Sequence, residues 1–299
     1  MGLQLDGVTK VFGKHVAVDH LTLDIPENQI YGFLGGNGAG KTTTFRMILG
    51  LLDQSGGTIL WNGSKLGYKQ SHLVGYLPEE RGLYPKLKVK DQITYLGKLR
   101  GMKKEDVLRE LEAWLKRLQV PEYMDKKIEE LSKGNQQKIQ FISAVIHRPK
   151  LLILDEPFSG LDPINVEILK KAVSDINRQG TSIVFSSHQM SHVEELCENL
   201  CILHKGEAVV QGSLRGVKQS FGKKNLMIHA EGDLEYLRNH PGVTQYKQLA
   251  EGCELQIENE DVSQTILESL HGKGFIRKFN LEEPSLNDIF IEKVGDSYE

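Results

Sequence analysis

Apolar and polar residues alternate along the first 34 positions, in the pattern of strands that bury one face. The segments LQLDGV, LTLDI and QIYGFL predict three strands, and the third runs into a glycine-rich loop. After this loop, KTTTFRMILGLL predicts a helix. GTILWNG and LVGYLPEE then predict two further short strands, the second of which ends at Pro78.

The spacing of apolar residues becomes helical over residues 91–120. In EDVLRELEAWLKRL, leucines recur at the positions of one helix face: Leu108, Leu111, Leu115 and Leu118. We expect a mainly helical insert over about residues 88–135, with these leucines in its core. The strand pattern returns in KLLILDEP and GTSIVFSSH, on either side of the predicted helix INVEILKKAVSDINRQ. This alternation predicts an α/β fold, in which helices flank a mostly parallel sheet.

The pattern of predicted elements changes in the last third of the chain. LCILHKGEAVVQG predicts a hairpin that turns at Lys205 and Gly206, and FGKKN, near residue 222, predicts a linker. The segments beyond it follow the order strand, helix, strand, strand, helix, strand, which is typical of a small ferredoxin-like α+β unit. A closing helix, SLNDIFIEKV, comes last. We therefore expect two domains, residues 1–221 and residues 222–299.

Composition and charge argue against several classes of protein, although local basic patches remain possible. The 299 residues carry a net charge of −3, which argues against a nucleic-acid partner bound through bulk charge. Three cysteines are a sparse, odd count that fits a reducing compartment. Cys197 and Cys201 are four residues apart, but without a second pair of ligands they predict buried thiols rather than a zinc site.

The sequence gives no sign of a membrane-spanning segment. The first ten residues, MGLQLDGVTK, contain no apolar signal core. No run approaches the roughly 18 apolar residues of a transmembrane helix. We expect neither a secretory signal nor a span, so any membrane contact would come through a partner.

A phosphate-binding loop is predicted at residues 35–43. GGNGAGKTT fits the pattern G-x-x-x-x-G-K-S/T, in which glycines let backbone N–H groups wrap a phosphate chain at the start of a helix. The residues expected to bind the nucleotide here are Gly35, Asn37, Gly38, Ala39, Gly40, Lys41, Thr42 and Thr43. Lys41 would reach the β- and γ-phosphates as a catalytic cation, and the hydroxyl of Thr42 would hold Mg²⁺.

Two further strands deliver polar groups to the same predicted sheet edge. Asp155 ends the apolar strand LLIL, where ligands of α/β proteins bind, and would hold Mg²⁺. Glu156 follows and would deprotonate the attacking water, unless the two carboxylates merely cap a helix. His188 ends VFSSH and would polarise the γ-phosphate; a lone histidine is more often structural, but here three strand-end groups converge.

LSKGNQQK, at residues 131–138, is a second helix start suited to an anion. Ser132 can cap the helix, Gly134 lets the backbone come close, and Asn135 adds polar donors. The sequence alone does not explain why one chain carries two such starts far apart.

Six motifs in order resemble those of the ATP-binding subunit of an ABC transporter: GGNGAGKTT, GYLPEERGLYP, LSKGNQQK, LLILDEP, SGLD and SSH. The resemblance covers about residues 2–220. The tail, which ends in LNDIFIEKVGD, is similar to the accessory domain of the sodium- and drug-export type. The resemblance implies a P-loop NTPase core with an antiparallel β subdomain and a helical subdomain.

The same resemblance implies roles for further residues. Phe12 would stack on adenine, the alternative being a core phenylalanine. Two cassettes would close head to tail, so that Ser132, Gly134 and Asn135 grip the nucleotide of the partner cassette. Asp162, in SGLD, would line that interface.

Two departures from the family pattern stand out. Glu79, with Glu80 next to it, replaces a glutamine, and its carboxylate would bind Mg²⁺ or a water. Lys133 and Asn135 replace the glycine and the glutamine of LSGGQ. The charge of Lys133 would either strengthen ATP-bound closure or remain solvated, and both alternatives stay open.

We therefore expect an ATPase that uses ATP and Mg²⁺ to power transport, with export favoured over import. Its partners would be a separate transmembrane permease subunit and a second ATPase subunit, identical or paralogous. The protein would be cytoplasmic, peripheral on the inner face of the cell membrane. The alternatives are a soluble ABC-type ATPase of translation or DNA repair and a plain P-loop GTPase or kinase.

Overall fold

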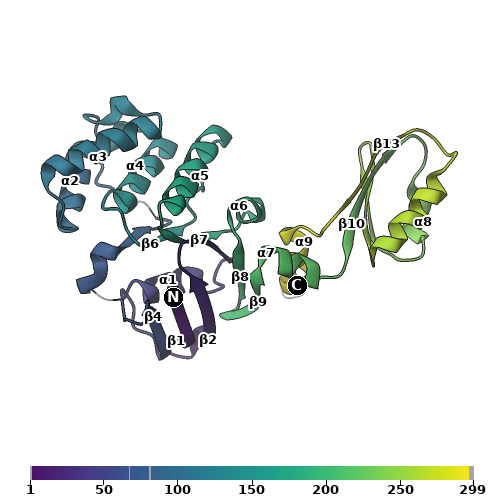
Figure 1. Ribbon diagram of the computed structural model, residues 1–299, viewed down its shortest axis with the longest axis horizontal. Coiled ribbons are helices and arrows are strands. Elements are labelled where there is room, and N and C mark those ends of the chain that lie inside the picture. The colour runs from purple at the N-terminus through teal and green to yellow at the C-terminus, as the bar shows by residue number, and fades with distance from the viewer. Residues whose placement is uncertain (1, 67, 81, 296–299) are drawn as a thin grey trace. The chain divides into compact units, whose positions relative to one another are not determined.

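The computed structural model describes residues 2–66, 68–80 and 82–295. The chain divides into two compact units, one ending at Gly212 and the other beginning at Ser213. Helix α7 (Leu214–Ser220) belongs to the second unit. The two units follow one another along the chain (Figure 1), and each has its own buried core.

A six-stranded sheet forms the centre of the first unit. In spatial order its strands are β5 (Val74–Leu77), β6 (Leu151–Asp155), β7 (Ser182–Ser187), β3 (Ile30–Leu34), β8 (Asn199–His204) and β9 (Glu207–Ser213). The pairs from β5 to β8 are all parallel, so their carboxyl ends lie at one edge. The turn between β8 and β9 lies at Lys205 and Gly206, whose positive φ angles suit a two-residue hairpin. The predicted parallel sheet is therefore confirmed.

A smaller antiparallel sheet is formed by two strands that precede the glycine-rich loop in sequence and one strand that follows it. Its strands, in the order β2-β1-β4, are β1 (Gly2–Phe12), β2 (His15–Pro26) and β4 (Gly56–Trp61). The apolar positions of these alternating strands, such as Leu3 and Val18, are fully buried against the central sheet. This is the antiparallel β subdomain that the family resemblance implied.

Helices cover the central sheet and form the insert (Figure 1). They are α1 (Lys41–Ile48), α2 (Val89–Leu99), α3 (Lys104–Arg117), α4 (Lys133–Val145), α5 (Pro163–Arg178) and α6 (Met190–Leu196). Short 3₁₀ segments are η1 (Tyr68–Leu73), η2 (Pro121–Tyr123) and η3 (Ile128–Glu130). Of the four leucines predicted to be core, Leu111, Leu115 and Leu118 are buried and Leu108 is half-buried. None of the helices in the described ranges is long and apolar enough to cross a membrane.

The second unit contains a four-stranded sheet in the order β11-β12-β10-β13, with every neighbouring pair antiparallel. Its elements after α7 are β10 (Lys224–Ala230), η4 (Glu235–Asn239), β11 (Val243–Leu249), β12 (Gly252–Ile257), α8 (Glu260–Leu270), β13 (Ile276–Glu282) and α9 (Leu286–Val294). This is the strand order of a ferredoxin-like unit. The first predicted helix is only a 3₁₀ turn, because Pro241 and Gly242 follow it and stop helical growth.

Candidate functional site

The glycine-rich loop links the end of β3 to the start of α1. Gly40 occupies the N-cap of α1 with a φ of 105°, and no side chain caps the helix there. A Cβ at Gly40 would lie 2.6 Å from the carbonyl oxygen of Ala17, so only glycine fits. The first N–H groups of α1 therefore remain available to an anion.

A cavity of about 660 Å³ opens over this loop, and its size falls in the range of small-molecule sites. Its lining residues are Phe12, His15, Ala17, Gly36, Asn37, Gly38, Ala39, Gly40, Lys41, Thr42, Thr43, Glu79, Asp155, Glu156 and His188. Most of the residues predicted for the nucleotide and the metal thus meet at one place. Gly35 is not in the lining, but its carbonyl oxygen holds the lysine of the loop.

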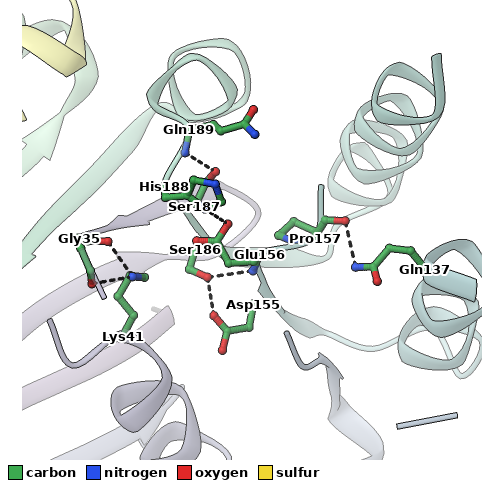
Figure 2. A network of polar contacts seen from close by, with 11 residues as sticks. Gly35, Lys41, Gln137, Asp155, Glu156, Pro157, Ser186, Ser187, His188 and Gln189 are labelled. Carbon is green, nitrogen blue, oxygen red and sulfur yellow. Dashed lines mark hydrogen bonds and ion pairs between the residues drawn. The ribbon is translucent and has the colours of Figure 1, made fainter. Parts of the chain in front are cut away.

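Lys41 is nearly buried, with 8% of its surface exposed. Its Nζ donates to the carbonyl oxygens of Gly35, at 2.7 Å, and Gly36, at 3.1 Å (Figure 2). Burial lowers the pKa of Lys41, and the negative charges of Glu156 and Asp155 oppose this shift. The ammonium group is therefore held inside the cavity, close to the carboxylates.

A hydroxyl and a carboxylate lie together on the metal side of the cavity. Thr42 Oγ1 donates to Asp155 Oδ2 at 2.9 Å, and Glu79 reaches the lining from the segment after β5. These are the hard oxygen ligands that Mg²⁺ prefers. Among the described residues no three His, Cys, Asp or Glu side chains are spaced to hold a metal alone.

The backbone at Glu156 is strained. Its φ is 50°, in the left-handed region that non-glycine residues rarely adopt, and such strain clusters at functional sites. The N–H of Glu156 donates to Ser186 Oγ at 3.0 Å, and this hydroxyl donates to Asp155 Oδ1 at 2.6 Å. One serine therefore holds both acidic residues (Figure 2).

The carboxylate of Glu156 meets the predicted histidine. His188 Nδ1 lies 2.9 Å from Glu156 Oε2, and both side chains face the cavity. Burial raises the pKa of Glu156, while the hydrogen bond and charge of His188, and the charge of Lys41, oppose the rise. A carboxylate with a raised pKa, next to a second titratable group, has the properties of a general base.

Ser186 lies within the segment VFSSH, from which only His188 was predicted to have a role. Ser186 is fully buried at the end of β7. Two polar residues at the end of a buried strand are the signal that could have found it. A buried hydroxyl needs hydrogen-bond partners, and the neighbouring strand ends in a carboxylate.

Ser132, Gly134 and Asn135 lie outside the cavity of their own chain. Ser132 caps α4 by accepting from the N–H of Asn135 at 3.3 Å, and Asn135 Nδ2 donates to Tyr123 Oη at 2.8 Å. Lys133 is exposed at the first position of the helix. This helix start therefore does not serve the same cavity as the glycine-rich loop.

Asp162 caps helix α5, where its Oδ1 accepts from the N–H of Asn165 at 3.0 Å. That backbone hydrogen bond is the main reason why the pKa of Asp162 is lowered.

Phe12, at the end of β1, is 48% exposed and lies under Lys10 Nζ, 5.0 Å from its ring centroid. Phe12 is thus not a core residue. Cys197 and Cys201 are free and buried.

Comparison with protein families gives two matches. Residues 18–159 match the family described as ABC transporter. Residues 212–294 match the family described as ATP-binding protein DrrA1-3-like, C-terminal domain. The first match lies within the first unit, and the second begins at Gly212, the last residue of the first unit, and extends over the second unit.

Relatives match over nearly the whole chain. The chain is 64% identical to the uncharacterized ABC transporter ATP-binding protein YhaQ of Bacillus subtilis, over 99% of this chain and 100% of that protein. It is 30% identical to the Nod factor export ATP-binding protein I of Cupriavidus metallidurans, over 98% of this chain and 97% of the relative. A solved structure of the ATP binding subunit of an ABC transporter has a TM-score of 0.70 and 27% identity, over 74% of this chain and 94% of that one.

Proposed function

Since the chain belongs to the ABC transporter family of ATP-binding proteins, we propose that the cavity described above is its ATP site and that Glu156 is the general base. The chain is the ATPase subunit of a transporter, which excludes the GTPase and kinase alternatives. The proposed residue roles rest mainly on one observation: His188 Nδ1 lies 2.9 Å from Glu156 Oε2, in a cavity that the glycine-rich loop also lines.

The geometry supports a role for each part of the cavity. Phe12 would stack on adenine, and the N–H groups of the loop and α1 would hold the phosphates. Lys41 would exchange its two carbonyl partners for phosphate oxygens. Thr42 and Asp155, with Glu79 from the next loop, would hold Mg²⁺, which neutralises charge on the β- and γ-phosphates. Glu156 would take a proton from the attacking water, and His188 would orient its carboxylate.

We propose that two cassettes close head to tail. Ser132, Gly134 and Asn135 present a helix start away from their own cavity, which supports their binding the γ-phosphate held by another copy. The second copy would be identical or a paralogous ATPase subunit. Asp162, at the start of α5, would lie at the same interface.

An exposed apolar surface supports contact with a membrane subunit. Tyr84, Leu87 and Tyr95 are 60%, 40% and 55% exposed and line one surface hollow. These residues follow, in sequence, the segment that carries Glu79, which lines the cavity. A partner bound to them would therefore contact the segment that leads into the cavity lining. We propose that this surface receives a separate transmembrane permease, which would place the chain on the cytoplasmic face of the membrane.

Export is favoured because one relative, similar over nearly the whole chain, is named as an export protein. We propose that residues 222–299 form an accessory domain that stabilises the dimer. In that proposal residues 1–221 form the ATP-binding domain, with a helical insert over about residues 88–135. The proposed boundary lies after α7, whereas the two compact units divide before it.

Replacement of Glu156 by glutamine tests the assignment. The Glu156→Gln variant should bind ATP with unchanged affinity, while turnover falls by about 10²–10⁴-fold, the range typical of a lost general base. Binding is measured by calorimetry, and turnover by phosphate release. Glu195→Gln, on α6 away from the cavity lining, is the matched control. Near-normal turnover in Glu156→Gln would show that another group is the base.

A further inference from the structure

Helix α4 carries glutamines whose side chains reach the backbone of other segments. Gln137 Nε2 donates to the carbonyl oxygen of Pro157 at 3.1 Å (Figure 2). Gln140 Nε2 donates to the carbonyl oxygens of Pro78, at 3.2 Å, and Glu80, at 3.1 Å. Since Gln137 and Gln140 are three residues apart, they lie on one face of the helix. That face is therefore bonded to two loops at once.

The two carbonyl groups bound by Gln140 flank Glu79, which lines the cavity. The side chain of Glu79 itself is exposed. Gln140 is only 3% exposed, and its two hydrogen bonds fix the backbone immediately before and after Glu79. They therefore set the direction in which the carboxylate of Glu79 enters the cavity.

The buried amide of Gln140 is only half satisfied. Its Oε1 is buried and finds no hydrogen-bond partner within residues 2–66, 68–80 and 82–295. Burying an unpaired acceptor is unfavourable. The two hydrogen bonds that Nε2 donates therefore explain why a glutamine lies here, since its Oε1 gains no hydrogen bond in return.

Gln137 acts in the same way on the loop after β6. Pro157 directly follows Glu156, whose φ of 50° must be maintained by its surroundings. Gln137 is 4% exposed, and its bond to the carbonyl oxygen of Pro157 anchors this loop to α4.

We propose that Gln140 and Gln137 are positioning residues, which fix the loops of Glu79 and Glu156 to the helix whose start meets the partner's nucleotide. The inference rests on the proposed function of the cavity. Helix α4, which Ser132 caps, holds both loops within its first two turns.

Gln140→Met tests the inference, because methionine keeps the volume but removes the amide. The matched control is Gln136→Met. Gln136 Nε2 also donates to two carbonyl oxygens, of Ile128 and Leu131, but it contacts neither catalytic loop. We expect the Mg²⁺ concentration for half-maximal ATPase activity to rise about threefold or more in Gln140→Met, as the loss of one or two hydrogen bonds implies, and not in the control. The melting temperatures of the two variants should fall to a similar extent.

A double-mutant cycle shows whether Gln140 acts through Glu79. In a Glu79→Gln background, Gln140→Met should change the Mg²⁺ dependence no further. Equal Mg²⁺ dependence of Gln140→Met and Gln136→Met, or an undiminished effect in the Glu79→Gln background, would overturn the inference. Gln140→Asn, which keeps the amide but cannot reach both carbonyls, replaces Gln140→Met if the latter does not fold. An unsubstituted chain that hydrolyses no ATP would instead overturn the proposed function.

Discussion

Ser186→Ala is the substitution that most directly tests how the two acidic residues are held. The Ser186 hydroxyl is fully buried, donates to Asp155 Oδ1 at 2.6 Å and accepts from the N–H of Glu156 at 3.0 Å. Alanine removes both bonds and leaves a buried N–H without a partner. The change adds no bulk, so its effect reports on the two hydrogen bonds.

The magnitude follows from these two losses. A hydrogen bond to a charged group contributes about 1.5–3 kcal/mol, and a buried unpaired N–H costs about 1–3 kcal/mol. Since one hydroxyl makes both bonds, we expect a loss of about 3 kcal/mol in the free energy of unfolding. For a unit of this size, that lowers the melting temperature by about 6–12 °C. Turnover should fall about tenfold or more, because Glu156 loses the bond that fixes its strained backbone.

Calorimetry and phosphate release measure the two effects. Ser187→Ala is the matched control: Ser187 is the next residue, is 2% exposed, and accepts one neutral hydrogen bond from the N–H of Gln189 at 3.0 Å. We expect this control to lose about 1 kcal/mol. If Ser186→Ala behaves like Ser187→Ala in both assays, the serine bridge does not organise the site, and the reasoning is refuted.

Two further predictions concern the helix start of α4 and the pH dependence of stability. Lys133→Ala should weaken ATP-driven dimerisation about threefold, because an exposed charge pair contributes up to about 1 kcal/mol; unchanged sedimentation profiles would show that Lys133 remains solvated. Burial, and then the charge of Arg100, lower the pKa of His147 from 6.5 to about 4. The unfolded chain therefore binds more protons below pH 6.5, and stability present at pH 7 is lost as the pH falls, by about 2 kcal/mol at pH 5. In His147→Gln, which can still donate to the carbonyl oxygen of Val74, this part of the loss should disappear in urea unfolding; an unchanged pH dependence would contradict the assignment.

The local motifs were predictable from the sequence, because their chemistry depends on neighbouring residues. The glycine-rich loop is one example, since the φ of Gly40 and the start of α1 follow from a contiguous string. The parallel sheet was predictable from alternating strands and helices, and the second unit from its element order. One element was predicted wrongly: the first helix of the second unit forms only the 3₁₀ segment η4, because Pro241 follows it closely and stops helical growth.

Only the tertiary structure decided the contacts between residues that lie far apart in the chain. The Ser186 bridge joins positions 31 apart, and Gln140 reaches across 62 residues to Pro78. No periodicity encodes such a pair, because it depends on which strands and helices become neighbours when the sheet forms. The same holds for LSKGNQQK: its capping chemistry is local, but its position outside the cavity of its own chain follows only from where α4 packs.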